Sequence, residues 1–118
     1  MRQNKFRIWD KIYKSMFQVS DISWACDGSI VYINGYIAED VILIQSTGLL
    51  DRNGKEIFDG DVVIVIYDDG FDEKLNVEWN NSKLRFILYN ENNGNKYSFD
   101  STLSERITVI GNIHEVSK

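Results

Sequence analysis

The placement of glycine constrains the fold of this 118-residue chain more than any other sequence feature. Proline is absent, and six of the eight glycines directly follow Asn or Asp. Asn-Gly and Asp-Gly pairs favour the positive φ angles of tight hairpin turns. Turn signals repeated through a short chain are typical of antiparallel sheets, so we expect a mainly β fold. The six glycines are Gly28, Gly35, Gly54, Gly60, Gly70 and Gly94.

The segments between these turns have the patterns of strands. Residues 5–9 alternate in the manner of a half-buried strand, and residues 62–67 are apolar on both faces, which predicts a central strand. Gly111 interrupts a strand-like segment at 106–116, which predicts a bulge or bend. Residues 41–45 fit either a buried strand or one turn of helix. Thr102 and Glu105 have the spacing of a capping box, which predicts a helical turn.

The densest group of turn signals lies within residues 44–61. Asn53-Gly54 predicts a hairpin, and Asp59-Gly60 is expected to turn the chain into the strand at 62–67. Gly48 is expected to end the element formed by residues 41–45. We interpret the whole segment as framework and not as a functional loop. Its structural motif residues are Thr47, Gly48, Asn53, Gly54, Gly60 and Asp61.

Length, charge and cysteine content limit the classes of partner and the compartment. A chain of 118 residues, 43% of them hydrophobic, fits a single domain spanning residues 1–118. The net charge of −5 argues against a protein built mainly to neutralise nucleic-acid phosphates. Cys26 is the only cysteine, so no intramolecular disulfide can form. The polar N-terminus and the short apolar runs predict neither a signal peptide nor a membrane helix, so we expect a cytoplasmic protein.

No pattern indicates catalysis, a cofactor or a metal site. His114 is the only histidine, and we interpret it as a strand-surface residue because no cysteine or serine stands at a suggestive spacing. Cys26 has no nearby basic residue to activate its thiol, so we expect a buried or half-exposed small hydrophobic residue. The acidic residues at 68–73 bracket Gly70 without the ligand spacing of a calcium loop, which indicates a solvated hairpin tip.

Three aspartates near the central turns leave two interpretations. Asp51, Asp59 and Asp61 could form a carboxylate pair for acid–base work, or each could cap its own turn. We favour the capping interpretation because Asp at such positions usually accepts hydrogen bonds from nearby backbone N–H groups.

Three segments together resemble a known family. They are residues 5–10 (KFRIWD), residues 47–63 with TGL, DRNGKEI and GDV in order, and residues 109–115 (VIGNIHE). Their order and spacing resemble the YopX family, small proteins found mostly in phages and prophages. The family often has an aromatic residue where this chain has Ser46, and residues 18–38 carry no family motif. The resemblance implies an SH3-like β-barrel or roll with additional N-terminal β elements and at most a short helix. It implies no established activity.

The leading functional hypothesis is a non-catalytic accessory or binding module. Its partner would be an unidentified phage or host protein, or a second copy of the chain in a homo-oligomer. The alternative is nucleic-acid binding, in which basic and aromatic side chains form a groove for a single strand. A small hydrolase or nuclease ranks third, and no membrane partner is expected. The candidate binding surface consists of Trp79, Arg85, Tyr89, Lys96 and Tyr97.

Overall fold

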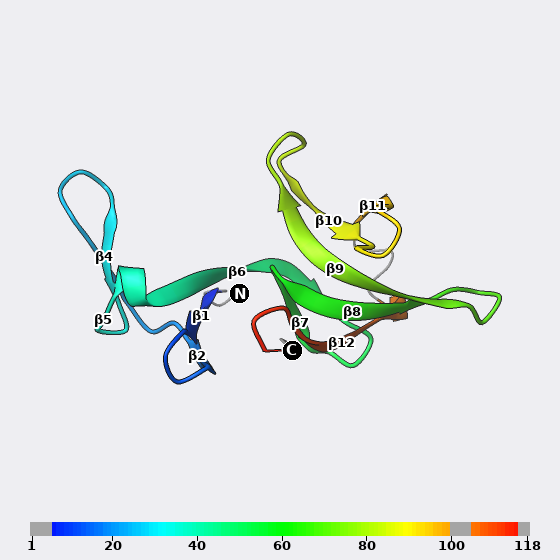
Figure 1. Cartoon of the computed structure of the whole chain (residues 1–118), viewed down its shortest axis with the longest axis horizontal. Helices are drawn as coiled ribbons and strands as arrows, with labels where there is room; N and C mark the ends of the chain where they lie inside the picture. Colours follow the sequence, from blue (N-terminus) through cyan, green and yellow to red (C-terminus); the bar gives the residue numbers. More distant parts are fainter. Residues whose placement is uncertain (1–5, 100–104, 116–118) are drawn as a thin grey trace. The chain divides into compact units, whose positions relative to one another are not determined.

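The computed structural model describes residues 6–99 and 105–115 and contains two compact units, Met1–Gln45 and Ser46–Lys118 (Figure 1). Strand β6 (Val41–Leu50) begins in the first unit and ends in the second. We describe each unit by itself. Among the described residues, no helix is long and apolar enough to cross a membrane.

The first unit combines a β-hairpin with a small sheet. The hairpin strands β1 (Phe6–Asp10) and β2 (Ser15–Gln18) pair with each other, and β1 also pairs with the first half of β6. A separate antiparallel sheet holds β3 (Ile22–Trp24), β4 (Ile30–Ile33) and β5 (Tyr36–Ile37). A 3₁₀ turn, η1 (Ala38–Asp40), leads into β6. The core of this unit is built on Ile8, Ile33 and Val41.

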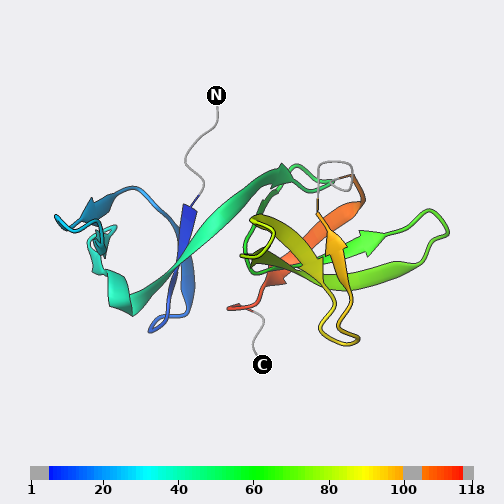
Figure 2. The same cartoon turned by 90° about the horizontal axis from the view of Figure 1, so that it is seen from above.

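The second unit is a curled antiparallel sheet in the order β11-β10-β9-β8-β12 (Figures 1 and 2). Its strands are β8 (Asp61–Ile66), β9 (Asp72–Asn80), β10 (Arg85–Tyr89), β11 (Lys96–Ser98) and β12 (Ile107–Asn112), and β7 (Glu56–Phe58) pairs with the second half of β6. Strand β8 lies between two neighbours, as its apolar residues predict. The core consists of Ile57, Val63, Val65, Leu75, Val77, Leu88, Phe99 and Ile107.

The predicted fold class is confirmed. The chain is mainly β, and its curled sheets form a half-barrel with additional N-terminal strands and the short turn η1. The Asn53-Gly54 turn joins β6 to β7, and Gly54 and Gly60 both have a φ of +83°. The predicted bulge is present between Val109 and Gly111, where β12 shifts register against β8.

Gly48 does not end a strand, contrary to our expectation. Residues 41–45 are strand, and β6 continues through Gly48 to Leu50 with a φ of +86° at the glycine. The bend is possible because side chains take over the backbone groups that leave the ladder. Ser46 Oγ accepts the N–H of Gly48 at 2.9 Å, and Thr47 Oγ1 accepts the N–H of Leu49 at 3.1 Å.

Two further expectations about single residues are wrong. Cys26 is exposed because it lies in the turn between β3 and β4, where neither face of the sheet covers it. Strand β12 ends at Asn112, and His114 lies in the following turn, where Asn112 Oδ1 accepts its N–H at 3.1 Å. The helical turn expected around Thr102 has its residues 101–104 outside the described residues.

Candidate functional site

The motif residues of the central segment form framework contacts. Thr47 Oγ1 donates to the carbonyl oxygen of Ile57 at 2.7 Å and so ties β6 to β7. The carboxylate of Asp51 accepts the N–H groups of Asn53 and Lys55 inside its turn, and its other oxygen accepts the N–H of Val109 on β12 at 3.0 Å. Burial alone would raise the pKa of Asp51, but these backbone donors outweigh burial and hold the pKa below its usual value.

A buried polar group fixes the second turn. Asp61 is almost fully buried and accepts the N–H of Phe58 at 2.8 Å and the side-chain amide of Asn112 at 3.0 Å. The same amide also donates to the carbonyl oxygen of Asp59 at 3.2 Å. The carboxyl group of Asp61 therefore caps its turn, as the capping interpretation predicts, whereas Asp59 contributes its backbone carbonyl to this contact. Sequence reasoning missed Asn112, because nothing in a lone Asn near the C-terminus signals that it contacts a turn 51 residues away.

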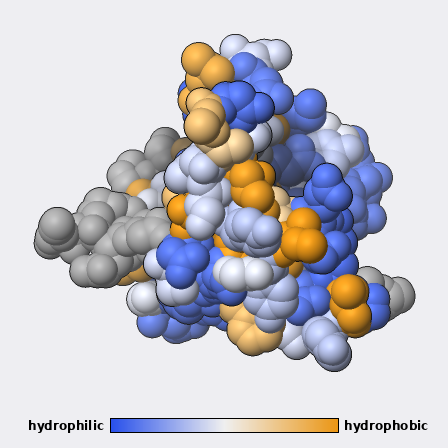
Figure 3. All heavy atoms as spheres, turned by 90° about the vertical axis from the view of Figure 1, so that its left-hand side faces the viewer, coloured by the Kyte–Doolittle hydropathy of each residue, from blue (hydrophilic) through white to orange (hydrophobic). Residues whose placement is uncertain are grey.

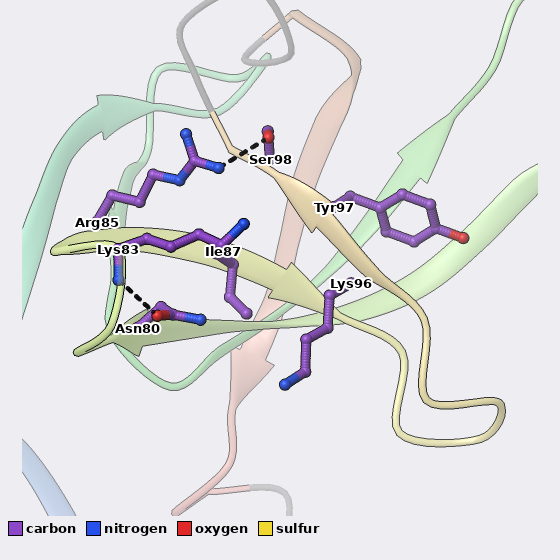
Figure 4. A pocket seen from close by; sticks show the side chains of 7 residues that line it. All are labelled: Asn80, Lys83, Arg85, Ile87, Lys96, Tyr97 and Ser98. Carbon is purple, nitrogen blue, oxygen red and sulfur yellow. Dashed lines mark hydrogen bonds between the residues drawn. The ribbon is translucent and has the colours of Figure 1, made fainter.

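A basic hollow lies on the face of β10 and β11 that is turned away from the core. It has a volume of about 120 Å³ and is the pocket drawn in Figure 4. Strand β10 places Arg85 and Ile87 on this face, and the register Ile87↔Ser98 puts Ser98 beside them. The turn after β9 supplies Lys83. The full lining consists of Asn80, Lys83, Arg85, Ile87, Lys96, Tyr97 and Ser98.

In the basic hollow, N–H groups donate hydrogen bonds to neutral oxygen atoms. Arg85 Nη2 lies 3.4 Å from Ser98 Oγ, and Asn80 Oδ1 accepts the backbone N–H of Lys83 at 2.9 Å (Figure 4). Lys96 Nζ lies 5.9 Å from the centre of the Tyr89 ring, within cation–π range. Within the described part of the chain, no carboxylate forms an ion pair with any of the three cations.

Four of the five residues of the predicted binding surface meet at this hollow. Arg85, Lys96 and Tyr97 line it, and Tyr89 contacts Lys96 beside it. The ring of Tyr97, however, points away from Arg85 (Figure 4). Trp79 does not join them, because its partner across the ladder is Phe86 and both rings belong to the opposite face. The two rings meet edge to face with centres 5.0 Å apart.

A carboxylate network on the other face joins Glu73 of β9 and Tyr97 of β11 to Tyr67 and Asn90, which follow β8 and β10. Glu73 accepts hydrogen bonds from the Tyr67 hydroxyl at 2.8 Å, from Asn90 Nδ2 at 2.6 Å and from the Tyr97 hydroxyl at 3.1 Å. The bond from Asn90, aided by the two phenols, holds the pKa of Glu73 below its usual value. Burial and the neighbouring Glu73 raise the pKa of Tyr67 to about 12. Glu73 therefore has a structural role in this part of the acidic hairpin.

The small sheet of the first unit has one covered and one exposed face. The register aligns Ile22, Ile33 and Tyr36, which pack against the core. The opposite face, which we call the outer face, carries the aligned residues Ser23, Tyr32 and Ile37. Tyr32 and Ile37 are 46% and 54% exposed. Figure 3 shows the surface on the side where β4 and β5 lie, with hydrophobic residues among hydrophilic ones.

Cys26 and His114 belong to different units. Burial raises the pKa of Asp59, while backbone donors and the electrostatic influence of His114 act in the opposite direction. Within residues 6–99 and 105–115, no group of three His, Cys, Asp or Glu side chains is placed to hold a metal ion.

The sequence matches the family model described as YopX protein over residues 5–118, which includes both units. The chain belongs to the YopX family. Protein EF1440 from Enterococcus faecalis has a similar crystal structure, with a TM-score of 0.63, 24% identity, and coverage of 94% of this chain and 93% of that one. The crystal structure of protein YopX from Bacillus subtilis gives a TM-score of 0.65 at 16% identity and covers 97% of this chain and 95% of that one. At these identities the likeness shows the fold alone. No curated protein matches the sequence.

Proposed function

We propose that this YopX-family chain is a non-catalytic binding module of phage or prophage origin, which contacts a partner protein in the host cytoplasm through the outer face of the small sheet. The observation that carries the proposal is the difference in burial between the two faces of the small sheet. The inner face is already used in the core, whereas Tyr32 and Ile37 stand side by side in the register and remain about half exposed. Exposed aromatic and aliphatic side chains that are held rigidly by a sheet are typical anchors of protein interfaces.

The partner expected from this chemistry is a protein surface without strong charge. Ser23, Tyr32 and Ile37 are all uncharged, so a charged partner would gain no ion pair there. A second copy of the chain meets the same requirement, because two uncharged faces can pair isologously without like-charge repulsion at the contact. The net charge of −5 repels a second copy at longer range, and salt screens that repulsion. Self-association through this face should therefore strengthen as salt is added.

The test compares a face variant with a matched control. The face variant carries Tyr32→Ser and Ile37→Ser, and the control carries Ile12→Ser and Ile110→Ser, which remove two apolar side chains that are exposed elsewhere. Light scattering measures the mass against the 13.7 kDa monomer, and affinity capture from host cells identifies partner proteins. The wild type and the control should associate or capture the same partner, and the face variant should lose it. Equal behaviour of all three proteins would show that the contact lies elsewhere.

A further inference from the structure

The basic hollow concentrates positive charge in a protein of net charge −5. Lys83 comes from the β9–β10 turn, Arg85 from β10 and Lys96 from β11, so three separate backbone segments contribute cationic side chains to its lining. Glu78 shares this face, opposite Ile87 on β9, but forms no ion pair with any of the three within the described chain. Cations that share a face without an ion-pair partner repel one another, and an anion that binds there relieves that repulsion.

The size of the hollow limits what it can accept. Its volume of about 120 Å³ is well below the roughly 300–1,000 Å³ of a typical cofactor or drug-sized pocket. A hollow of this size suits a small group such as one tetrahedral oxyanion. A larger ligand would therefore insert a single anionic group and lie with the rest of its length across the sheet.

The lining supplies donors that suit a phosphate group. The guanidinium of Arg85 presents several N–H groups in a planar fork, the geometry that matches two oxygens of a phosphate. The ammonium groups of Lys83 and Lys96 add charge. Ser98 contributes a hydroxyl. The side-chain oxygen of Asn80 accepts the N–H of Lys83, which leaves its NH₂ group to donate to a ligand.

We propose that the basic hollow binds a phosphate group of single-stranded nucleic acid, with Tyr89 as a stacking surface for an adjacent base. The choice of nucleic acid over an acidic peptide depends on two residues. Ile87, the apolar residue of the hollow, is only 5% exposed, so the hollow offers a peptide no apolar contact of useful size. The half-exposed ring of Tyr89 stands next to Lys96, and a flat aromatic surface beside a cation suits a base and its phosphate.

This site is independent of the protein contact proposed above. Every residue of the hollow lies in the second unit, whereas the outer face lies in the first. The two contacts also respond to salt in opposite directions, since displaced counterions make phosphate binding weaker as salt is added.

The first experiment measures fluorescence anisotropy of a fluorescein-labelled oligothymidine of about 12 nucleotides, within the site size of small barrel folds. One phosphate held in the hollow predicts a slope of log K against log salt near −0.7, so affinity should fall about 3-fold between about 50 and 200 mM NaCl. Arg85→Gln should weaken binding and bring the slope closer to zero. Arg52→Gln, at an exposed arginine in the β6–β7 turn, is the charge-matched control and should leave the slope unchanged. Absence of binding at low salt, or equal slopes for both variants, would overturn the proposal.

The second experiment separates stacking from charge. Tyr89→Leu should weaken oligothymidine binding by about 5-fold or more while the salt slope stays constant, because stacking releases no counterion. A thermal melt compares the fold of this variant with the wild type. Lys96→Gln, which removes the cation beside the ring and keeps the ring itself, should instead flatten the salt slope. Inorganic phosphate should compete only weakly, because it supplies the anion without the base. Polyglutamate that displaces the oligonucleotide as effectively as unlabelled oligothymidine would instead assign the hollow to acidic peptides.

Discussion

The two glycines Gly54 and Gly60 form a natural pair for testing how the central turns are held. Both have a φ of +83°, so alanine at either site adopts a left-handed backbone that costs about 1–2 kcal/mol. Their surroundings differ. A Cβ atom at Gly54 would meet nothing within 4 Å, whereas one at Gly60 would lie 3.3 Å from Asn112 Nδ2 and 3.3 Å from Ile113 Cγ1. The difference between the two alanine variants therefore isolates the effect of crowding.

The crowding at Gly60 should be expensive because one of its neighbours cannot move. Ile113 is about half exposed and can rotate away, but Asn112 is fully buried. Its amide nitrogen donates to the backbone carbonyl of Asp59 and to the carboxyl group of Asp61, and a net hydrogen bond contributes about 0.5–1.5 kcal/mol. Partial loss of these bonds adds about 1 kcal/mol to the backbone cost. We expect Gly54→Ala to destabilise by about 1–2 kcal/mol and Gly60→Ala by about 2–3 kcal/mol.

The assay is urea unfolding followed by resolved amide signals of the second unit in NMR spectra, so that the first unit does not contribute. With an m-value of about 1–2 kcal/mol/M, the two midpoints should differ by about 0.5–1 M. Gly54→Asn is the control, because Asn tolerates the left-handed region and should recover part of the stability lost in Gly54→Ala. Equal midpoints for the two alanine variants would refute the crowding argument. Midpoints equal to that of the wild type would refute the assignment of positive φ.

Three further predictions concern single side chains. Burial raises the pKa of Asp59, so the folded protein binds the proton of this carboxyl group more tightly than the unfolded chain does. The stability that this proton contributes is lost as pH rises through the folded pKa. Asp59→Asn should therefore stabilise the protein at neutral pH, and in pH-dependent unfolding the difference from the wild type should disappear below about pH 4. The pKa of Glu73 is shifted in the opposite direction, so Glu73→Gln should destabilise the protein at neutral pH and progressively less in acid. In the same variant, ultraviolet titration should show the pKa of Tyr67 falling from about 12 towards its usual value. Cys26 should react with a thiol reagent in the native protein at a rate close to that of the denatured chain, whereas strong protection would contradict its exposure.

The local parts of the fold could be predicted from the sequence because their causes are local. Asn53-Gly54 and Asp59-Gly60 specify turns through the φ angles of two adjacent residues, and the apolar residues at 62–66 specify a strand with neighbours on both sides. The bulge at Gly111 has the same kind of origin. At Gly48 the local rule failed. The polar side chains of Ser46 and Thr47 bind the backbone around the bend, so the strand continues where the glycine alone would suggest an end.

The long-range contacts could not be read from the sequence, because residues of unremarkable type acquire their roles from distant partners. Strand β1 pairs with β6 across more than thirty residues, and Asn112 reaches a turn 51 residues earlier. Arg85, Tyr89, Lys96 and Tyr97 could be expected to lie near one another because β10 and β11 follow each other in the chain and pair. Trp79 was misplaced because strand alternation puts it on the same face as Val77, towards the core, and Phe86 receives it there.

The residues that identify the family and the residues proposed to bind ligands are different sets, and the contacts explain why. Thr47, Asp51 and Asp61 use their side chains on the backbone of neighbouring strands and turns, so the motif specifies the half-barrel and has little capacity left for a ligand. The outer face lies within residues 18–38, and the basic hollow lies within residues 80–98, between the segments that carry the motif. A fold closed by its own polar side chains can change these surfaces without loss of its framework. The two contacts proposed for this chain therefore lie in segments that the framework leaves available, outside the motif.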